Sequence, residues 1–212
     1  MIGVQISLYQ PRIFELEKCT MLLDMSSHQM VNVSGIYEIE NLDEYTGLKC
    51  LWLEHNGIRF IENLQHQKEL HCLYLQHNLI EHQENLEPLE KLDTLNVCNN
   101  QISQIENIAC LKVLHTLQIS HNKLQTVQDI EHLKYCDELG VLDLSYNRLD
   151  DPGVLDVFEQ MKNLKTITVW LLNLSTGTLT VPMECDGSMY VYQCMQACVE
   201  YCTVHFVREK RI

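Results

Sequence analysis

The sequence predicts an α/β solenoid, in which a curved parallel β-sheet forms the concave face and 3₁₀ turns and short α-helices return the chain along the convex face. Two observations support this prediction. Asparagine recurs at steps of 22, 22, 22 and 25 residues, and the apolar residues around it repeat the frame L-x-x-L-x-L/V/I-x-x-N-x-I/L. The asparagines are Asn56, Asn78, Asn100, Asn122 and Asn147. A fixed period of this length is the signature of stacked repeats.

This frame is the register of leucine-rich repeats. Its fourth and sixth positions are apolar and the residue between them points to the opposite face, which is strand spacing. One coil cannot bury its apolar residues alone, so the core must form between stacked coils. Five full units begin at Leu48, Leu70, Leu92, Leu114 and Leu139, and a partial sixth begins at Leu164.

The repeated asparagines have a structural role in this prediction. At the end of each short strand the chain turns, and its backbone groups would be buried without partners. An asparagine side chain has both donors and an acceptor, so it can satisfy them. We therefore expect a ladder of amides inside the solenoid and assign these five residues no direct function.

The segments between the strands are short and read I-E-N-L or close to it, as in residues 61–64 and 105–108. Such short returns favour 3₁₀ turns over long helices. In the last full unit, Pro152 follows an aspartate, which is typical of a helix start and predicts a short α-helix over 152–162. Gln83 stands where the return of the second unit should have isoleucine, and we expect a local weak point there.

The repeat register divides the chain into four segments. Residues 1–25 have no repeat, 26–47 form a degenerate capping repeat, 48–169 hold the repeats, and 170–212 form a divergent, cysteine-rich tail. In the capping repeat, Ser34 replaces the asparagine. Its apolar residues Val31, Ile36, Ile39 and Leu42 fall 22 positions before Leu53, Ile58, Ile61 and Leu64.

The tail departs from the register, since Asn173 falls one position too late for the ladder. Cys194, Cys198 and Cys202 have the spacing of one helical stripe. Three thiols so arranged do not make a tetrahedral zinc site, and no metal is predicted there. The tail is interpreted either as a disordered segment or as an alternative ending of the chain. Without a capping coil, the edge formed by Leu164, Ile167 and Val169 is expected to be poorly covered and to favour self-association.

Length and composition exclude several classes of function. The chain has 212 residues, which is one domain, and a formal charge of −14, which disfavours binding to nucleic acid and favours basic protein surfaces. No segment is apolar and long enough for membrane insertion, and the N-terminus lacks the pattern of a signal peptide. The ten cysteines are therefore expected to be reduced thiols in the cytoplasm.

The concave face is the candidate binding site, because its residues point away from the core. Trp52 and Tyr74 are expected to be neighbours there, and exposed aromatic residues are enriched where proteins bind one another. A lateral pair that stabilises the sheet is the alternative interpretation. His55 and His77 are also neighbours, but no further ligand completes a metal shell. The predicted partner-binding residues are Trp52, Tyr74, Glu54, His55, Gln76, His77, Asn96, Gln118, His121, Asp143 and Tyr146.

No phosphate-binding loop, catalytic motif or cofactor motif occurs in the sequence, so a non-enzymatic protein without cofactors is predicted. The 22-residue unit with I-E-N-L returns resembles the sds22-like class of leucine-rich repeat proteins. The resemblance covers about residues 36–168, with its longest stretch over 110–158. Members of this class include phosphatase-1 regulators, an axonemal dynein light chain and assembly factors for axonemal dynein arms.

The resemblance is closest to the assembly factors. It implies a protein-interaction scaffold of the cytoplasm and cilium, with axonemal dynein subunits, other assembly factors or chaperones as partners. A regulatory subunit of phosphatase-1 and a structural dynein light chain remain the alternatives, and both would use the same concave face.

Overall fold

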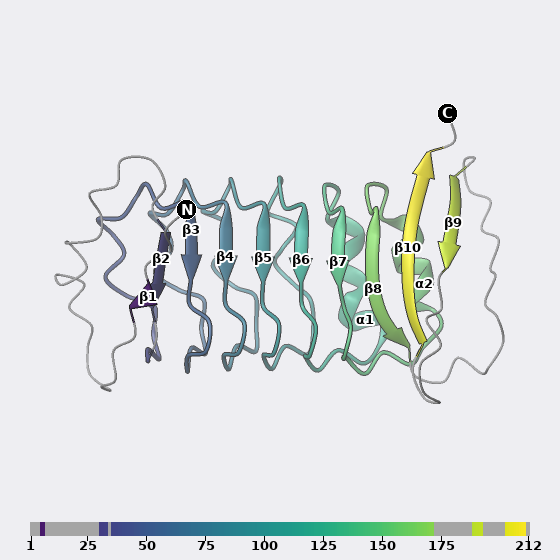
Figure 1. Ribbon diagram of the computed structural model, residues 1–212, viewed down its shortest axis with the longest axis horizontal. Coiled ribbons are helices and arrows are strands. Elements are labelled where there is room, and N and C mark those ends of the chain that lie inside the picture. Colours follow the sequence, from purple (N-terminus) through teal and green to yellow (C-terminus); the bar gives the residue numbers. More distant parts are fainter. Residues whose placement is uncertain (1–4, 7–29, 34, 172–187, 193–201, 211–212) are drawn as a thin grey trace.

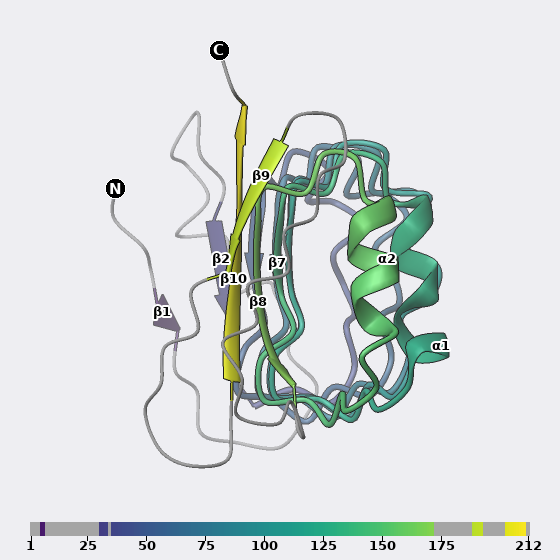
Figure 2. The ribbon, with the colours of Figure 1, turned by 90° about the vertical axis from the view of Figure 1, so that its right-hand side faces the viewer.

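The computed structural model shows one ten-stranded sheet with short helices on one side of it (Figures 1 and 2). It describes residues 5–6, 30–33, 35–171, 188–192 and 202–210, with side chains over 35–169. The strands follow the order β1-β2-β3-β4-β5-β6-β7-β8-β10-β9. They are β1 (Gln5–Ile6), β2 (Met30–Val33), β3 (Cys50–Trp52), β4 (Cys72–Tyr74), β5 (Thr94–Asn96), β6 (Thr116–Gln118), β7 (Val141–Asp143), β8 (Thr166–Leu171), β9 (Ser188–Tyr192) and β10 (Cys202–Lys210).

The strands from β2 to β8 are parallel, and from β3 to β7 each consists of the third to fifth positions of the repeat frame. The predicted solenoid is confirmed. The central residue of each strand points into the core and forms a column of fully buried side chains along the array. The column consists of Leu51, Leu73, Leu95, Leu117, Leu142 and Ile167. Each member is covered by the coils on either side of it, as stacked repeats require.

The returns opposite the sheet are tight turns, as the sequence predicts. In each short coil two consecutive backbone bonds join residues three apart, for example Gln67 N to Leu64 O and Leu70 N to Gln67 O. This is the hydrogen-bond pattern of a 3₁₀ turn. The apolar residues of these turns, such as Ile61 and Leu64, lie in the same core as the strand residues.

Helices occur only in the two longer units of the described chain. They are α1 (Val127–Ile130), the 3₁₀ helix η2 (Glu131–Tyr135) and α2 (Val154–Gln160). The prediction for 152–162 is confirmed for α2, although the helix begins two residues late. The N-cap residue is Gly153, whose N donates a bond of 2.7 Å to Asp151 Oδ1. The sequence prediction missed α1, although Thr126 and Asp129 form the capping box that marks its start.

The asparagine ladder forms as predicted. Asn100 is typical: its Oδ1 accepts from Ile80 N at 3.0 Å, and its Nδ2 donates to Leu75 O at 2.9 Å in the preceding coil. The same Nδ2 also donates to Val97 O and Cys98 O within its own turn. Asn147 makes equivalent bonds. The three extra residues between Asn122 and Asn147 are therefore accommodated in the return of the preceding unit and leave the ladder intact.

A second asparagine ladder lies in the returns, and the sequence interpretation did not include it. Asn63, Asn85 and Asn107 are the third residues of the I-E-N-L segments. Each donates from Nδ2 to a carbonyl of the preceding coil, with distances of 2.7, 2.7 and 2.9 Å. All three have a positive φ, between 56° and 57°, a conformation that asparagine adopts more readily than most residues. Each coil is therefore bonded to its neighbour at two separate points.

The register predicted for the first coil is wrong at its strand. A period of 22 would set Val31 level with Leu53, but Val31 pairs with Leu51. Ile36 does keep the predicted register, because Gly57 N bonds to Ile36 O as Leu79 N bonds to Ile58 O. Five positions separate Val31 from Ile36, against seven from Leu51 to Ile58 in the next coil, so the turn is two residues shorter. Ser34, the predicted replacement for the asparagine, lies outside the described residues.

The expectation of an uncovered C-terminal edge is also wrong. Leu164 is 6% exposed and Ile167 and Val169 are fully buried. On the sheet side, β8 pairs antiparallel with β10, from Thr166 opposite Val207 to Leu171 opposite Cys202 (Figure 1). The backbone edge of β8 is thus occupied, and the expected self-association loses its basis.

The helical stripe predicted for the tail cysteines is wrong at Cys202, which is the first residue of strand β10. Cys194, Cys198 and Asn173 lie outside the described residues.

Gln83 is fully buried, in the column otherwise formed by Ile39, Ile61 and Ile105. Its Oε1 accepts from Glu106 N at 2.9 Å, while its Nε2 has no hydrogen-bond partner. Gln67 is a second such position that the sequence interpretation missed, with its Nε2 on Leu42 O and its Oε1 unpaired. Unpaired buried amide groups are costly, so the expected weak point is present at Gln83.

Candidate functional site

The candidate site is the outer sheet face, the side of β3–β7 turned away from the helices (Figure 2). It consists of the third, fifth, seventh and eighth positions of the five full repeats. These residues are Cys50, Trp52, Glu54, His55, Cys72, Tyr74, Gln76, His77, Thr94, Asn96, Cys98, Asn99, Thr116, Gln118, Ser120, His121, Val141, Asp143, Ser145 and Tyr146. The ten at the third and fifth positions are all half-buried. Parallel pairing sets equivalent positions side by side across the sheet.

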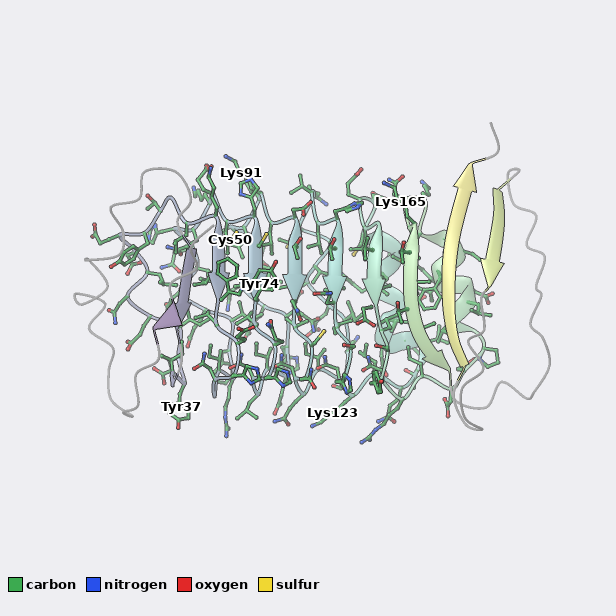
Figure 3. The ribbon with its side chains drawn as sticks, in the orientation of Figure 1. Tyr37, Cys50, Tyr74, Lys91, Lys123 and Lys165 are labelled. Atoms are coloured by element: carbon green, nitrogen blue, oxygen red, sulfur yellow. The ribbon has the colours of Figure 1, made fainter. Side chains whose placement is uncertain are left out.

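Trp52 and Tyr74 lie against each other, as predicted (Figure 3 labels Tyr74). Their ring centroids are 5.3 Å apart and their planes differ by 7°, which is a stacked arrangement. Opposite positions on neighbouring strands lie about 4.8 Å apart, so the register itself brings the rings into contact. Both side chains remain partly exposed. The pair is the largest apolar feature at the third and fifth positions of this face.

Glu54 and Gln76 extend the site beyond the ends of β3 and β4. Gln76 Nε2 donates a short hydrogen bond to Glu54 Oε2, so the amide holds the carboxylate in place. Gln76 Oε1 is buried and has no hydrogen-bond partner. Two polar groups beside the aromatic pair are thus fixed in position, and one acceptor among them lacks a donor.

The seventh position becomes less accessible along the array, although the repeat register alone would direct the whole row outward. Glu54 and Gln76 are half-buried, but Cys98, Ser120 and Ser145 are between 6% and 9% exposed. These three are small side chains that bond to neighbours within the face. Ser120 Oγ donates to Cys98 Sγ at 3.1 Å, and Ser145 Oγ donates to Asp143 Oδ1 at 2.7 Å.

At the fifth positions of β5 and β7, the side chains accept hydrogen bonds from backbone groups two residues farther along the chain. Asn96 Oδ1 accepts from Cys98 N at 3.0 Å, and Asp143 Oδ1 accepts from Ser145 N at 3.0 Å. Gln118 lies between them in the same row and is half-buried. The Trp52 end of the face is therefore the part where large side chains are presented.

The eighth position forms a row of left-handed residues. His55, His77, Asn99, His121 and Tyr146 have φ values between 54° and 59°. His55 and His77 are neighbours as predicted, and the structure shows two ring stacks in the row. The rings of His55 and His77 lie 4.2 Å apart, and those of His121 and Tyr146 lie 3.9 Å apart. Among the residues with described side chains, no group of three or more histidine, cysteine or acidic residues is arranged to hold a metal ion.

The five cysteines with described side chains are free thiols. Burial raises the pKa of four of them, Cys50, Cys98, Cys110 and Cys136. Burial, followed by the neighbouring Cys72 thiol, raises the pKa of Cys50 to about 11. Burial also raises the pKa of Cys136 to about 12. Cys136 is 8% exposed and occupies the return position that Leu111 fills one coil earlier.

Ionisation of Cys136 should make stability depend on pH. An unfolded thiol ionises near pH 9.0, and the folded thiol near 12. The buried neutral thiol therefore contributes fully below pH 9.0, and its contribution is lost as the pH rises toward 12. The wild type is compared with Cys136→Ala at pH 8 and at pH 10.5. Between these pH values the unfolding free energy of the wild type should fall by about 2 kcal/mol more than that of the variant. Urea denaturation of both chains at the two pH values measures this. A constant difference between them would contradict it.

Known structures share this architecture. An internalin (inlF) of Listeria monocytogenes is 27% identical to this chain with a TM-score of 0.57, over 65% of this chain and 39% of the internalin chain. A leucine-rich repeat protein of Leptospira interrogans is 20% identical with a TM-score of 0.53, over 65% of this chain and 36% of the other. This chain thus spans less than half the length of either. No family model matches the sequence, and no curated protein matches it.

The strand register, the asparagine ladder and these neighbours define the class: the chain is an α/β leucine-rich repeat solenoid. Within the described part of the chain, no helix has both the length and the apolar character needed to cross a membrane.

Proposed function

We propose that the chain is a non-enzymatic protein-interaction scaffold and that its outer sheet face binds a partner protein. The leucine-rich repeat fold of its structural neighbours supports this class of function. The observation that carries the proposal is the partly exposed stack of Trp52 on Tyr74. Aromatic residues supply most of the binding energy in many protein interfaces, because they bury a large area at a low cost in conformational entropy.

The alternative role of the aromatic pair is to stabilise the sheet. A stacked pair does contribute, by about 0.5–1.5 kcal/mol beyond its buried area. However, the other fifth-position residues, Asn96, Gln118 and Asp143, hold the same register without aromatic rings. The strands therefore pair regardless of this stack, which favours a role in binding.

Replacement of Trp52 with alanine should weaken partner binding by at least about tenfold, because an aromatic hot spot typically contributes about 2 kcal/mol or more. The melting temperature should fall by only a few degrees, since Trp52 points away from the core. Both can be measured with purified protein, by titration calorimetry against the captured partner and by circular dichroism. Phe60→Ala removes an exposed aromatic side chain outside the outer sheet face, so it is the matched control and should leave binding unchanged. Unfolding of the Trp52 variant, or unaltered affinity, would refute the proposal.

The finer proposal concerns the partner. Residues 36–168 resemble dynein axonemal assembly factor 1, and this resemblance supports a role in the cytoplasmic preassembly of axonemal dynein arms for motile cilia. The expected partners are dynein subunits, other assembly factors or chaperones. Affinity capture from ciliated cells, followed by mass spectrometry, tests this. Recovery of dynein heavy or intermediate chains supports the proposal. Recovery of the phosphatase-1 catalytic subunit without dynein would instead indicate a regulator of the sds22 type.

A further inference from the structure

The outer sheet face is acidic. Its twenty residues include the carboxylates of Glu54 and Asp143 but no lysine or arginine. The whole chain also has a formal charge of −14. An approaching partner therefore meets a face whose own carboxylates outnumber its lysine and arginine side chains, and a segment with positive side chains complements it.

Glu54 is the carboxylate best placed to meet such a segment. The ion pairs between described residues join His66 to Asp43, His82 to Glu106, Lys91 to Glu69 and Lys134 to Glu131. None of these pairs involves Glu54. Gln76 donates to its Oε2, and this bond fixes the direction of the carboxylate without neutralising its charge. Gln76 Oε1 beside it also lacks a donor but is buried, so the carboxylate of Glu54 is the acceptor that this end of the face presents.

The aromatic stack lies within reach of the same carboxylate. Trp52 and Glu54 are two residues apart on one chain, so they are separated by about 6.6 Å along the strand direction. A guanidinium group lies flat on an aromatic ring and presents its N–H groups at the rim of its plane. A group seated on the Trp52–Tyr74 pair can therefore direct donors toward Glu54. A lysine ammonium can make the contact with the ring or the carboxylate, but it lacks the planar fork that makes both at once.

We infer that the outer sheet face binds an extended, basic segment of a protein partner through an arginine side chain, which stacks on one ring of the Trp52–Tyr74 pair and pairs with Glu54. This inference rests on the proposed function and names the chemistry of the partner. Asp143 lies on the same face four strands farther along, where its Oδ1 already accepts from Ser145. Recognition is therefore centred on the Trp52 end.

Selection of random twelve-residue peptides displayed on phage against the full chain provides the probe. Peptides that bind wild type but not Trp52→Ala report the outer sheet face, and we expect arginine to be enriched among them at one fixed position. The leading peptide is then synthesised with arginine, lysine or citrulline at that position. Citrulline retains the shape of arginine without its charge. We expect about tenfold weaker binding for citrulline and an intermediate affinity for lysine.

Glu54→Gln should weaken the arginine peptide by about tenfold and leave the citrulline peptide unaffected. Glu159→Gln is the matched control, since it removes one carboxylate from the exposed side of α2, and it should change neither affinity. Peptides that need Trp52 but lack arginine, or that bind Glu54→Gln equally well, would overturn this inference and leave the proposed function standing. If no selected peptide depends on Trp52, both fail.

Discussion

Replacement of Asn100 with alanine is expected to lower the free energy of unfolding by about 3 kcal/mol or more. The substitution removes the acceptor of Ile80 N and the donor to three carbonyl groups, those of Leu75, Val97 and Cys98. The site is buried, so water cannot replace these bonds fully, and each unpaired buried group costs about 1–3 kcal/mol. Urea denaturation followed by circular dichroism measures the change.

Asn107→Ala is the matched control within the second ladder. Asn107 is exposed and makes one bond, to Gln83 O, so water can hydrate the carbonyl that it leaves. A loss of about 1 kcal/mol is expected, partly because alanine is less tolerant of the positive φ at this position. Equal losses for the two variants would show that burial does not set the strength of the ladders, and an unchanged midpoint for Asn100→Ala would refute its structural role.

The second large effect is expected for Leu117→Ala, in the centre of β6. Leu117 is 1% exposed and lies in the column between Leu95 and Leu142. Coils on both sides hold the walls of the resulting cavity apart, so the site cannot collapse readily. A loss of about 2–5 kcal/mol of unfolding free energy follows from deletions of this kind.

Thr116→Ala provides the comparison one residue away. Thr116 is half-buried on the outer sheet face, so the shortened side chain leaves no closed cavity. Its expected loss is below about 1 kcal/mol. The pair therefore tests the alternation of the strand directly by urea denaturation. Similar losses at the two positions would contradict the assignment of Leu117 to the core.

The repeat register allowed the fold and much of the candidate site to be predicted, because one period fixes both the direction of a side chain and its neighbours. The positions of Leu117, Trp52 and Tyr74 follow from it. The effects of side-chain size do not follow from the register, which alone would direct Cys98 and Ser120 outward, although both are buried. Their small volumes allow the neighbouring residues to close over them.

Local signals account for other differences. The capping box at Thr126 marks α1, and the asparagines of the I-E-N-L segments mark the second ladder, yet both were outside the frame on which the prediction relied. The C-terminal edge could not be predicted in this way. The pairing of β8 with β10 joins residues 31 to 41 positions apart in an antiparallel register, and a repeat of 22 residues contains no information about it.

The two asparagine ladders have a mechanical consequence. One ladder runs near the strand ends and the other along the returns, so the coils over 56–107 are bonded to their neighbours at the returns as well as beside the sheet. Anchorage at a single line would leave each coil free to pivot about that line, whereas two separated lines resist torsion. The array over 56–107 should therefore resist twisting. A partner that docks along it then meets side chains whose spacing changes little through thermal motion.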